Sequence, residues 1–242
     1  MYNKQLLLKL EFLSLFRLVR EHYTLKELSS ILNIDIPTLS KYTTGTLLPS
    51  IKRIKKIIPI LLDLVDPVKE IKATLISGSF TFPEMNNILN TKPYLLMWIV
   101  SQTLKKLELD KFDKIMTIEG GGLAYATFLA IITNKKVVYG IRDVFIEGGI
   151  SETYNTPDAE YYSPKMKKYI TIPKNSIKRG DRVIIVDDIS WSGGTIYTLY
   201  RLAESLGAKI THIYLIAIFR DTLEKLKQKI NVDITPMIII PR

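Results

Sequence analysis

The sequence predicts an α/β domain with a mainly parallel sheet flanked by helices, preceded by a small all-α domain. Residues 1–66 contain only helical patterns of apolar residues. Beyond Pro67, short β-rich runs alternate with helical stretches, and strands separated by helices are typical of a parallel sheet. A chain of 242 residues has room for two modest domains. We therefore expect one domain over residues 1–66 and a second over residues 67–242.

Four helices are expected in the first domain. Apolar residues recur at near-helical spacing over residues 3–20. The second helix begins after Thr24, because Thr24 and Glu27 can form a capping box. The third helix follows Asp35, which is a good N-cap. A long basic and apolar helix comes next and ends before Pro67, because the residue that precedes a proline avoids the helical region.

The second domain is expected to alternate between helices and strands. Its helices are predicted near residues 84–90, 93–109, 123–133, 195–206 and 223–229. Its strands are predicted at residues 114–118, 137–142, 169–172, 182–186 and 210–219. A long polar connection, residues 145–168, separates the second strand from the third, and connections of this length are usually functional or disordered.

The composition excludes several classes of protein. The chain has no cysteine, which rules out a disulfide framework, a thiol nucleophile and cysteine-ligated zinc. No apolar run approaches the roughly 18 residues of a membrane helix, so we expect no membrane association and a cytoplasmic protein. The net charge of +10 favours a polyanionic partner. Half of that excess lies in residues 1–65, which carry 10 basic and 5 acidic side chains.

Residues 25–45 have the pattern of two helices joined by a tight turn. Ser29 is small where the two helices must cross, and Asn33 tolerates the left-handed backbone of such a turn. The segment resembles the helix-turn-helix of Cro/repressor-type proteins, although that family usually has glycine at the position of Asn33. The resemblance implies that the second helix of the motif enters the DNA major groove. A small helical bundle that binds no DNA is the alternative.

This resemblance places the DNA contacts on two consecutive helices. The expected DNA-binding residues are Thr38, Ser40, Lys41, Thr43, Lys52 and Arg53. The first four can reach base edges or phosphates. The last two would contact phosphates, and would add affinity and salt dependence rather than specificity. The expected partner is a pseudo-palindromic operator in double-stranded DNA, bound by a homodimer.

Residues 182–195 combine a buried strand, two adjacent acids and a glycine-rich loop that opens a helix. The N-terminus of that helix suits a phosphate, and the glycines let the backbone approach it closely. The carboxylates can accept hydrogen bonds from vicinal sugar hydroxyls. The pattern therefore predicts a site for a 5′-phosphorylated ribose. Its expected ligand-binding residues are Asp187, Asp188, Ile189, Ser190, Trp191, Ser192, Gly193, Gly194 and Thr195.

This signature resembles that of the type I phosphoribosyltransferases, whose loop binds phosphoribosyl pyrophosphate (PRPP). The resemblance covers roughly residues 84–220, and residues 147–149 are similar to the orotate phosphoribosyltransferases. It implies that the backbone of a second glycine loop, residues 119–122, binds the pyrophosphate. The expected pyrophosphate residues are Glu119, Gly120, Gly121 and Arg142. The connection over residues 145–168 then corresponds to the family's mobile loop, and Asp221 and Thr222 are candidates for the base-covering hood. The family implies Mg²⁺ only as the companion of PRPP, and no residue set resembles a dedicated metal cage.

The charge around this site bears on whether the chain is an enzyme or a sensor. An acid, Asp143, stands where a second base would be expected, and residues 143–164 contain no lysine or arginine. These features favour a regulator in which a phosphoribosyltransferase-like domain without catalysis senses PRPP or a nucleoside monophosphate. A helix-turn-helix fused to such a domain also resembles archaeal and bacterial transcription regulators of nucleotide or central metabolism. The alternative is an active phosphoribosyltransferase for orotate or a purine base with a DNA-binding appendage. An RNA-binding attenuator is a third hypothesis, disfavoured because A-form RNA hides its major groove.

Overall fold

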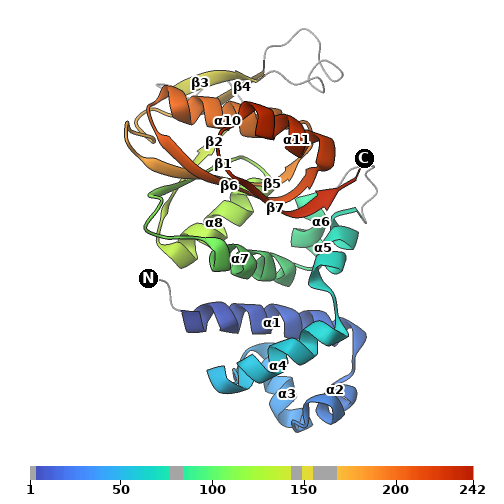
Figure 1. Cartoon of the computed structure of the whole chain (residues 1–242). Helices are drawn as coiled ribbons and strands as arrows, with labels where there is room; N and C mark the ends of the chain where they lie inside the picture. Colours follow the sequence, from blue (N-terminus) through green and yellow to red (C-terminus); the bar gives the residue numbers. More distant parts are fainter. Residues whose placement is uncertain (1–3, 77–83, 143–148, 155–167, 242) are drawn as a thin grey trace. The chain divides into compact units, whose positions relative to one another are not determined.

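The computed structural model describes residues 4–76, 84–142, 149–154 and 168–241, and it divides into two compact units. The first unit spans residues 1–107 and the second spans residues 108–242. Figure 1 traces both units along the chain. The predicted mobile loop over residues 145–168 and Asp143 lie largely outside the described residues.

The described part of the first unit is helical. Its helices are α1 (Lys4–His22), α2 (Leu25–Leu32), α3 (Ile36–Thr44), α4 (Ile51–Leu64), α5 (Pro67–Ile76), α6 (Met85–Thr91) and α7 (Tyr94–Lys106). The predicted caps are present, because Thr24 and Glu27 form the capping box and the Asp35 side chain accepts from the backbone N–H of Thr38. The turn between α2 and α3 has Asn33 in the left-handed region, with φ 51°.

This unit extends past the predicted domain boundary at Pro67. The sequence predicts α6 and α7 but not α5, which begins at Pro67, three residues after the last residue of α4. Proline is well suited to a first helical position, so Pro67 both stops one helix and starts the next. The unit reaches Leu107 because α7 packs along α1.

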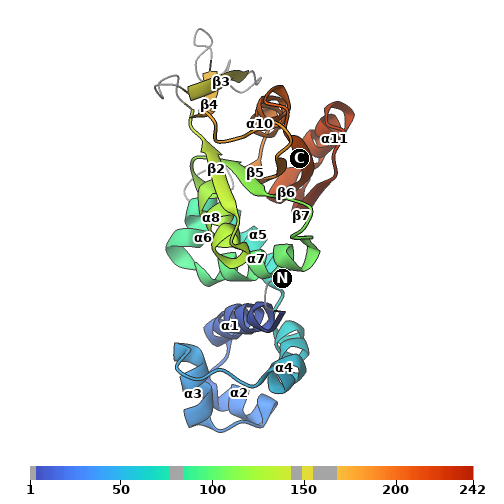
Figure 2. The same ribbon diagram turned by 90° about the vertical axis from the view of Figure 1, so that its left-hand side faces the viewer.

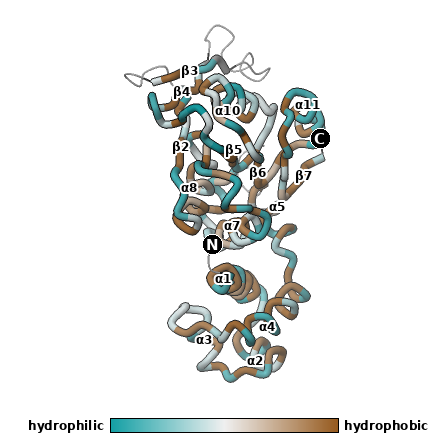
Figure 3. The backbone as a smooth tube through the Cα atoms, turned by 60° about the vertical axis from the view of Figure 1, so that its left-hand side comes forward, coloured by the Kyte–Doolittle hydropathy of each residue, from teal (hydrophilic) through white to brown (hydrophobic). Residues whose placement is uncertain are grey.

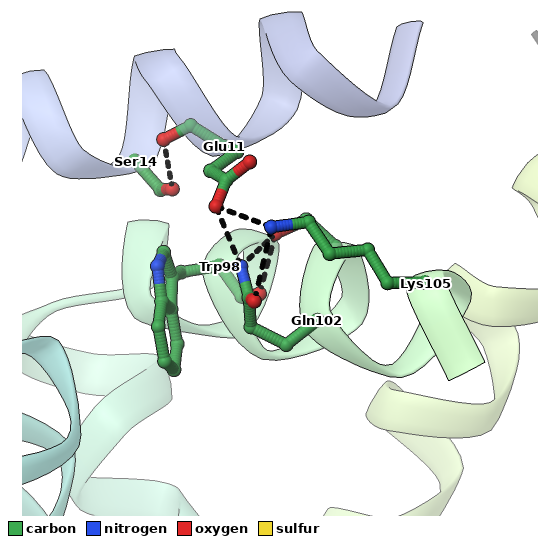
Figure 4. A network of polar contacts seen from close by, with 6 residues as sticks. Glu11, Ser14, Trp98, Gln102 and Lys105 are labelled. Carbon is green, nitrogen blue, oxygen red and sulfur yellow. Dashed lines mark hydrogen bonds and ion pairs between the residues drawn. The ribbon is translucent and has the colours of Figure 1, made fainter. Parts of the chain in front are cut away.

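A buried carboxylate ties α1 to α7. The Glu11 side chain is only 6% exposed and accepts from Lys105 Nζ at 2.6 Å and from Gln102 Nε2 at 3.0 Å. Figure 4 shows these two α7 side chains converging on Glu11 of α1. A buried charge is costly unless it is paired, so Lys105 is the group that makes this position of Glu11 tolerable.

Lys105→Met is therefore expected to lower the free energy of unfolding by about 1–2 kcal/mol. This is less than breaking a fully buried pair costs, because Lys105 is partly exposed and Gln102 remains. Urea denaturation of the purified variants measures the effect. Lys72→Met, at an exposed position of α5, is the matched control. Equal midpoints for the two variants would show that the ion pair contributes nothing.

The second unit contains a parallel sheet with helices on both faces. Its elements are β1 (Lys114–Ile118), α8 (Gly121–Thr133), β2 (Lys136–Gly140), β3 (Gly149–Tyr154), β4 (Lys168–Pro173), β5 (Arg182–Ser190), α10 (Gly194–Ser205), β6 (Lys209–Phe219), α11 (Arg220–Lys229) and β7 (Ile234–Ile240). The strand order is β2-β1-β5-β6-β7, and every neighbouring pair is parallel. Figures 1 and 2 show α10 and α11 on one face of this sheet and α8 on the other. The predicted parallel α/β fold is confirmed.

Two strands of this unit are not predicted from the sequence. β3 lies inside the polar stretch that was expected to be a connection, and it pairs with β4 in a separate antiparallel sheet. β7 contains Pro236, which argues against a strand in a sequence, but edge strands tolerate proline and β7 lies at the edge of the sheet.

The core of this unit is the apolar interior around the sheet. β5 and β6 contribute the longest buried runs, and α10 buries Ile196, Leu199 and Leu202. Most residues of α11 are hydrophilic, as the colouring of the tube in Figure 3 shows, and only Thr222, Leu223 and Leu226 are buried in that helix. None of the described helices has the length and apolarity needed to cross a membrane.

Candidate functional site

The strand order places a topological switch point between β1 and β5. From β1 the chain proceeds outward to β2, whereas from β5 it proceeds the other way to β6 and β7. Open parallel sheets bind ligands at the carboxyl ends of the strands at such a point. The predicted ligand residues lie at this edge, because Glu119 follows β1, Arg142 follows β2, and Asp187 and Asp188 lie near the end of β5.

The two adjacent acids are strand residues. β5 runs to Ser190, four residues beyond the predicted end, and pairs with β6 through Ile189 and Ser190. The predicted end of this strand at residue 186 is therefore wrong. The reason is that the sheet partner β6 is itself long enough to extend the pairing. Between β5 and α10, the loop is reduced to residues 191–193.

Asp187 is a buried carboxyl in an unusual electrostatic setting. Its side chain is almost fully buried, and Oδ1 accepts the backbone N–H of Asp188 at 3.0 Å. Burial raises the pKa of Asp187 well above its ordinary value, and the neighbouring Asp188 carboxylate raises it further. The positive charge of Arg142 opposes this rise. A carboxyl whose pKa is raised in this way, near the carboxyl end of a parallel strand, is typical of a ligand site.

Two glycines are the N-cap residues of the helices that follow β1 and β5. Gly193 has φ +79°, and a side chain there would strike Leu226 of α11 at 2.9 Å. Gly120 has φ +105° and precedes α8. The N-cap residues of α8 and α10 are glycines, which have no side chain to cap these helices, and the backbone N–H groups at a helix N-terminus suit an anion.

Glu119 and Arg142 hold each other at the ends of β1 and β2. The Glu119 carboxylate accepts the backbone N–H of Arg142 at 2.6 Å, and Arg142 Nη1 donates to the backbone oxygen of Glu119 at 3.2 Å. Arg142 itself is exposed. The structure thus brings together Asp187, the second glycine loop and Arg142, which the sequence predicted separately.

The short loop after β5 is held by α11. Thr222 Oγ1 donates to the backbone oxygen of Trp191 at 2.5 Å, and the Trp191 ring packs on Phe219 with centroids 4.8 Å apart. Thr222, a predicted hood residue, therefore supports the loop backbone. Ser190 is buried, and its hydroxyl lacks a hydrogen-bond partner among the described residues.

Thr117 and Gly122 are the residues whose part in this site the sequence did not reveal. Gly122 lies so close to Asp187 that a Cβ there would be 2.3 Å from Oδ1, and 2.7 Å from Thr117 Oγ1. Gly122 belongs to the predicted glycine loop, so the run of three glycines is a signal, but its contact with Asp187 depends on the sheet order. Thr117 carries no sequence signal of its own.

The predicted DNA-binding residues belong to the other unit and lie on α3 and α4. Ser40, Lys41, Lys52 and Arg53 are exposed. Thr38 is half-buried, and the Thr43 hydroxyl donates to the backbone oxygen of Leu39 at 3.1 Å, which turns it toward its own helix. Arg53 Nη1 donates to the Tyr42 hydroxyl at 3.5 Å.

A resident metal centre is not supported by the donor groups. The described residues contain no cluster of three or more histidine, aspartate or glutamate side chains that could hold an ion. The two carboxylates of β5 do not by themselves make a protein cage for Mg²⁺.

Comparison with known proteins agrees with the parallel α/β fold. A model of the phosphoribosyl transferase domain matches residues 95–240. The hypoxanthine/guanine phosphoribosyltransferase of Aciduliprofundum boonei is 30% identical over 162 residues, which cover 66% of this chain and 83% of that protein. The protein of the same name from Methanocaldococcus infernus is 33% identical over 135 residues, covering 55% of this chain and 69% of the relative.

Solved structures show the same fold. Adenine phosphoribosyltransferase from Thermoanaerobacter pseudethanolicus has a TM-score of 0.60 and 24% identity, and the similarity covers 72% of this chain and 99% of that one. The yeast enzyme, from Saccharomyces cerevisiae, has a TM-score of 0.58 and 22% identity over 71% and 98%. With the family match over residues 95–240, the chain belongs to the phosphoribosyl transferase domain family.

Proposed function

We propose that the chain is a phosphoribosyltransferase that binds PRPP at residues 187–195 and transfers its phosphoribosyl group to a purine base. The observation that carries this proposal is the buried Asp187 carboxyl beside two glycine-led helix N-termini at the switch point. The relatives named for hypoxanthine and guanine support a purine over orotate as the acceptor.

Each part of the site has a task in this reaction. The N–H groups at the start of α10 bind the 5′-phosphate, and Asp187 and Asp188 accept hydrogen bonds from the ribose hydroxyls. The backbone of residues 119–122 and Arg142 face the pyrophosphate. As the bond from C1′ to the pyrophosphate oxygen breaks, a bond from C1′ to a base nitrogen forms and the base loses a proton. The carboxylates stabilise the positive charge that develops on the sugar. Mg²⁺ bound to PRPP would neutralise part of the charge of the leaving pyrophosphate.

The test is release of pyrophosphate from PRPP in the presence of hypoxanthine, guanine, adenine or orotate. Release that depends on one of the purines is the expected result. PRPP binding without release for any base would contradict the transferase proposal, and would leave the ligand site in place.

We propose regulation of transcription as a second function, in which the phosphoribosyl ligand is the effector of a DNA-binding homodimer. The observation in its favour is the pair α2 and α3, joined by the left-handed Asn33 and followed by exposed basic residues on α4. Ser29 Oγ donates to the backbone oxygen of Ile34 at 2.6 Å and fixes this turn. The paucity of basic residues over residues 143–164 also favours a sensor.

Footprinting on the DNA upstream of the chain's own gene, with and without Mg²⁺ and PRPP, tests the second function. An inverted repeat whose protection changes with PRPP is expected. Lys52→Ala with Arg53→Ala should weaken the protection and reduce the salt slope by about two, because each lysine or arginine releases about one counterion. Lys69→Ala with Lys72→Ala, on exposed positions of α5, is the matched control. Absence of specific protection at moderate salt would contradict this function.

A further inference from the structure

Thr117 has a buried hydroxyl that nothing in its strand explains. Its side chain lies on β1 with 0% exposure, and Oγ1 has no hydrogen-bond partner among the residues that the structure describes. Most buried side-chain hydroxyls are hydrogen-bonded, so an exception next to a ligand site calls for a functional reason.

The missing side chain of Gly122 creates a notch between Thr117 and Asp187. A Cβ built on Gly122 would lie 2.7 Å from Thr117 Oγ1 and 2.3 Å from Asp187 Oδ1, so these two oxygens are no more than 5.0 Å apart. No side chain separates them, because the residue between them is glycine. Because the structure gives Thr117 Oγ1 no partner, a hydrogen bond to Asp187 requires a change in the Thr117 rotamer or a movement of the carboxyl.

Burial and the neighbouring Asp188 carboxylate both disfavour the ionised form of Asp187, which a hydrogen-bond donor would stabilise. Asp187 Oδ1 accepts the backbone N–H of Asp188, and a side-chain hydrogen bond with the Asp188 carboxyl raises the pKa of Asp187. The nearby charged groups are the Asp188 carboxylate on the same strand and Arg142 after β2. Helix α8 carries no charged residue. The charged residues of β1 and β6, Lys114 and Lys209, lie at the opposite ends of their strands, and those of α10, Arg201 and Glu204, lie in its second half.

We propose that Thr117 is a positioning residue whose hydroxyl donates to the Asp187 carboxylate across the Gly122 notch and holds it ionised toward the ribose hydroxyls. The expected effect on PRPP binding rests on the proposed function, whereas the arrangement of Thr117, Gly122 and Asp187 does not depend on it. Burial alone favours the protonated carboxylic acid, and a hydrogen bond to the charged form opposes that preference. Both oxygens of a carboxylate can accept a sugar hydroxyl, whereas one oxygen of a carboxylic acid carries the proton and acts as a donor.

The first measurement needs no ligand. Titration of the Asp187 side-chain carboxyl by carbon-detected NMR, assigned through Asp187→Asn, gives its pKa in the wild type, Thr117→Val and Thr117→Ser. Thr117→Val keeps the shape of the side chain, and we expect it to raise the pKa of Asp187 by about one unit because a donor to the ionised form is lost. Thr117→Ser should restore the wild-type pKa. Thr133→Val is the control, since it removes another buried threonine hydroxyl, one that bonds within α8. An unchanged pKa in Thr117→Val would overturn the inference.

The second measurement is the affinity for PRPP as a function of pH. Thr117→Val should bind PRPP more weakly than the wild type, by up to about tenfold at pH values below the pKa of Asp187, and recover as the pH rises, since one pKa unit corresponds to a factor of ten. A loss that is equal at every pH would indicate a merely structural role and overturn the inference. Thr117→Ala, with a smaller side chain, repeats both measurements if the valine variant does not fold. A wild type that fails to bind PRPP would refute the proposed function, while the ligand-free titration would still decide the role of Thr117.

Discussion

Replacing Asp187 and Asp188 together by asparagine is expected to lower the affinity for PRPP by about a hundredfold or more. Each carboxylate is proposed to accept a sugar hydroxyl, and a hydrogen bond to a charged group contributes about 1.5–3 kcal/mol. Asparagine keeps the size of the side chain but offers one neutral oxygen in place of two charged ones. Equilibrium binding of PRPP to the folded variant measures the effect.

A matched control separates this effect from a change in net charge. Asp63→Asn with Glu224→Gln removes two negative charges at exposed positions, on α4 and α11. Its PRPP affinity should equal that of the wild type. If the chain also binds DNA, the Asp187 and Asp188 variant should keep its basal DNA affinity and lose only the response to PRPP. Undiminished PRPP binding by this variant would place the ligand elsewhere.

Gly122→Ala is expected to have the second largest effect. The new methyl group would lie 2.3 Å from Asp187 Oδ1 and 2.7 Å from Thr117 Oγ1, closer than any side-chain Cβ is found. Either α8 shifts or the Asp187 carboxyl turns away, and overpacking of this kind costs about 1–3 kcal/mol. We expect a lower melting temperature and PRPP binding that is weaker by about ten- to a hundredfold, if the movement of Asp187 costs the same free energy in binding.

The control for Gly122→Ala is Thr127→Ala, an exposed position on the same helix. It should leave both the melting temperature and the PRPP affinity close to those of the wild type. Native stability together with native affinity in Gly122→Ala would contradict the close approach of α8 to β5.

The parts of the fold that local chemistry determines were predictable. The caps at Thr24 and Asp35 and the left-handed Asn33 each follow from one or two residues, and the structure has all of them. The alternation of β-branched runs and helices likewise gave the parallel sheet. The two strands that were missed depend on partners distant in sequence, because β3 is defined by pairing with β4 and β7 by its place at the sheet edge.

The candidate site was predictable as motifs but not as a constellation. The acids of β5 and the glycines at residues 120–122 and 193–194 stand out in the sequence, whereas the notch between Thr117 and Asp187 does not. That notch depends on the order in which β1 and β5 pair and on the path of α8 across them, which no local pattern encodes.

The most direct test of the central claim is equilibrium binding of PRPP to the wild-type chain in the presence of Mg²⁺, measured by titration calorimetry. The account predicts saturable binding of one PRPP to each chain. Heats that show no saturable binding would contradict the assignment of residues 187–195 as the phosphoribosyl site.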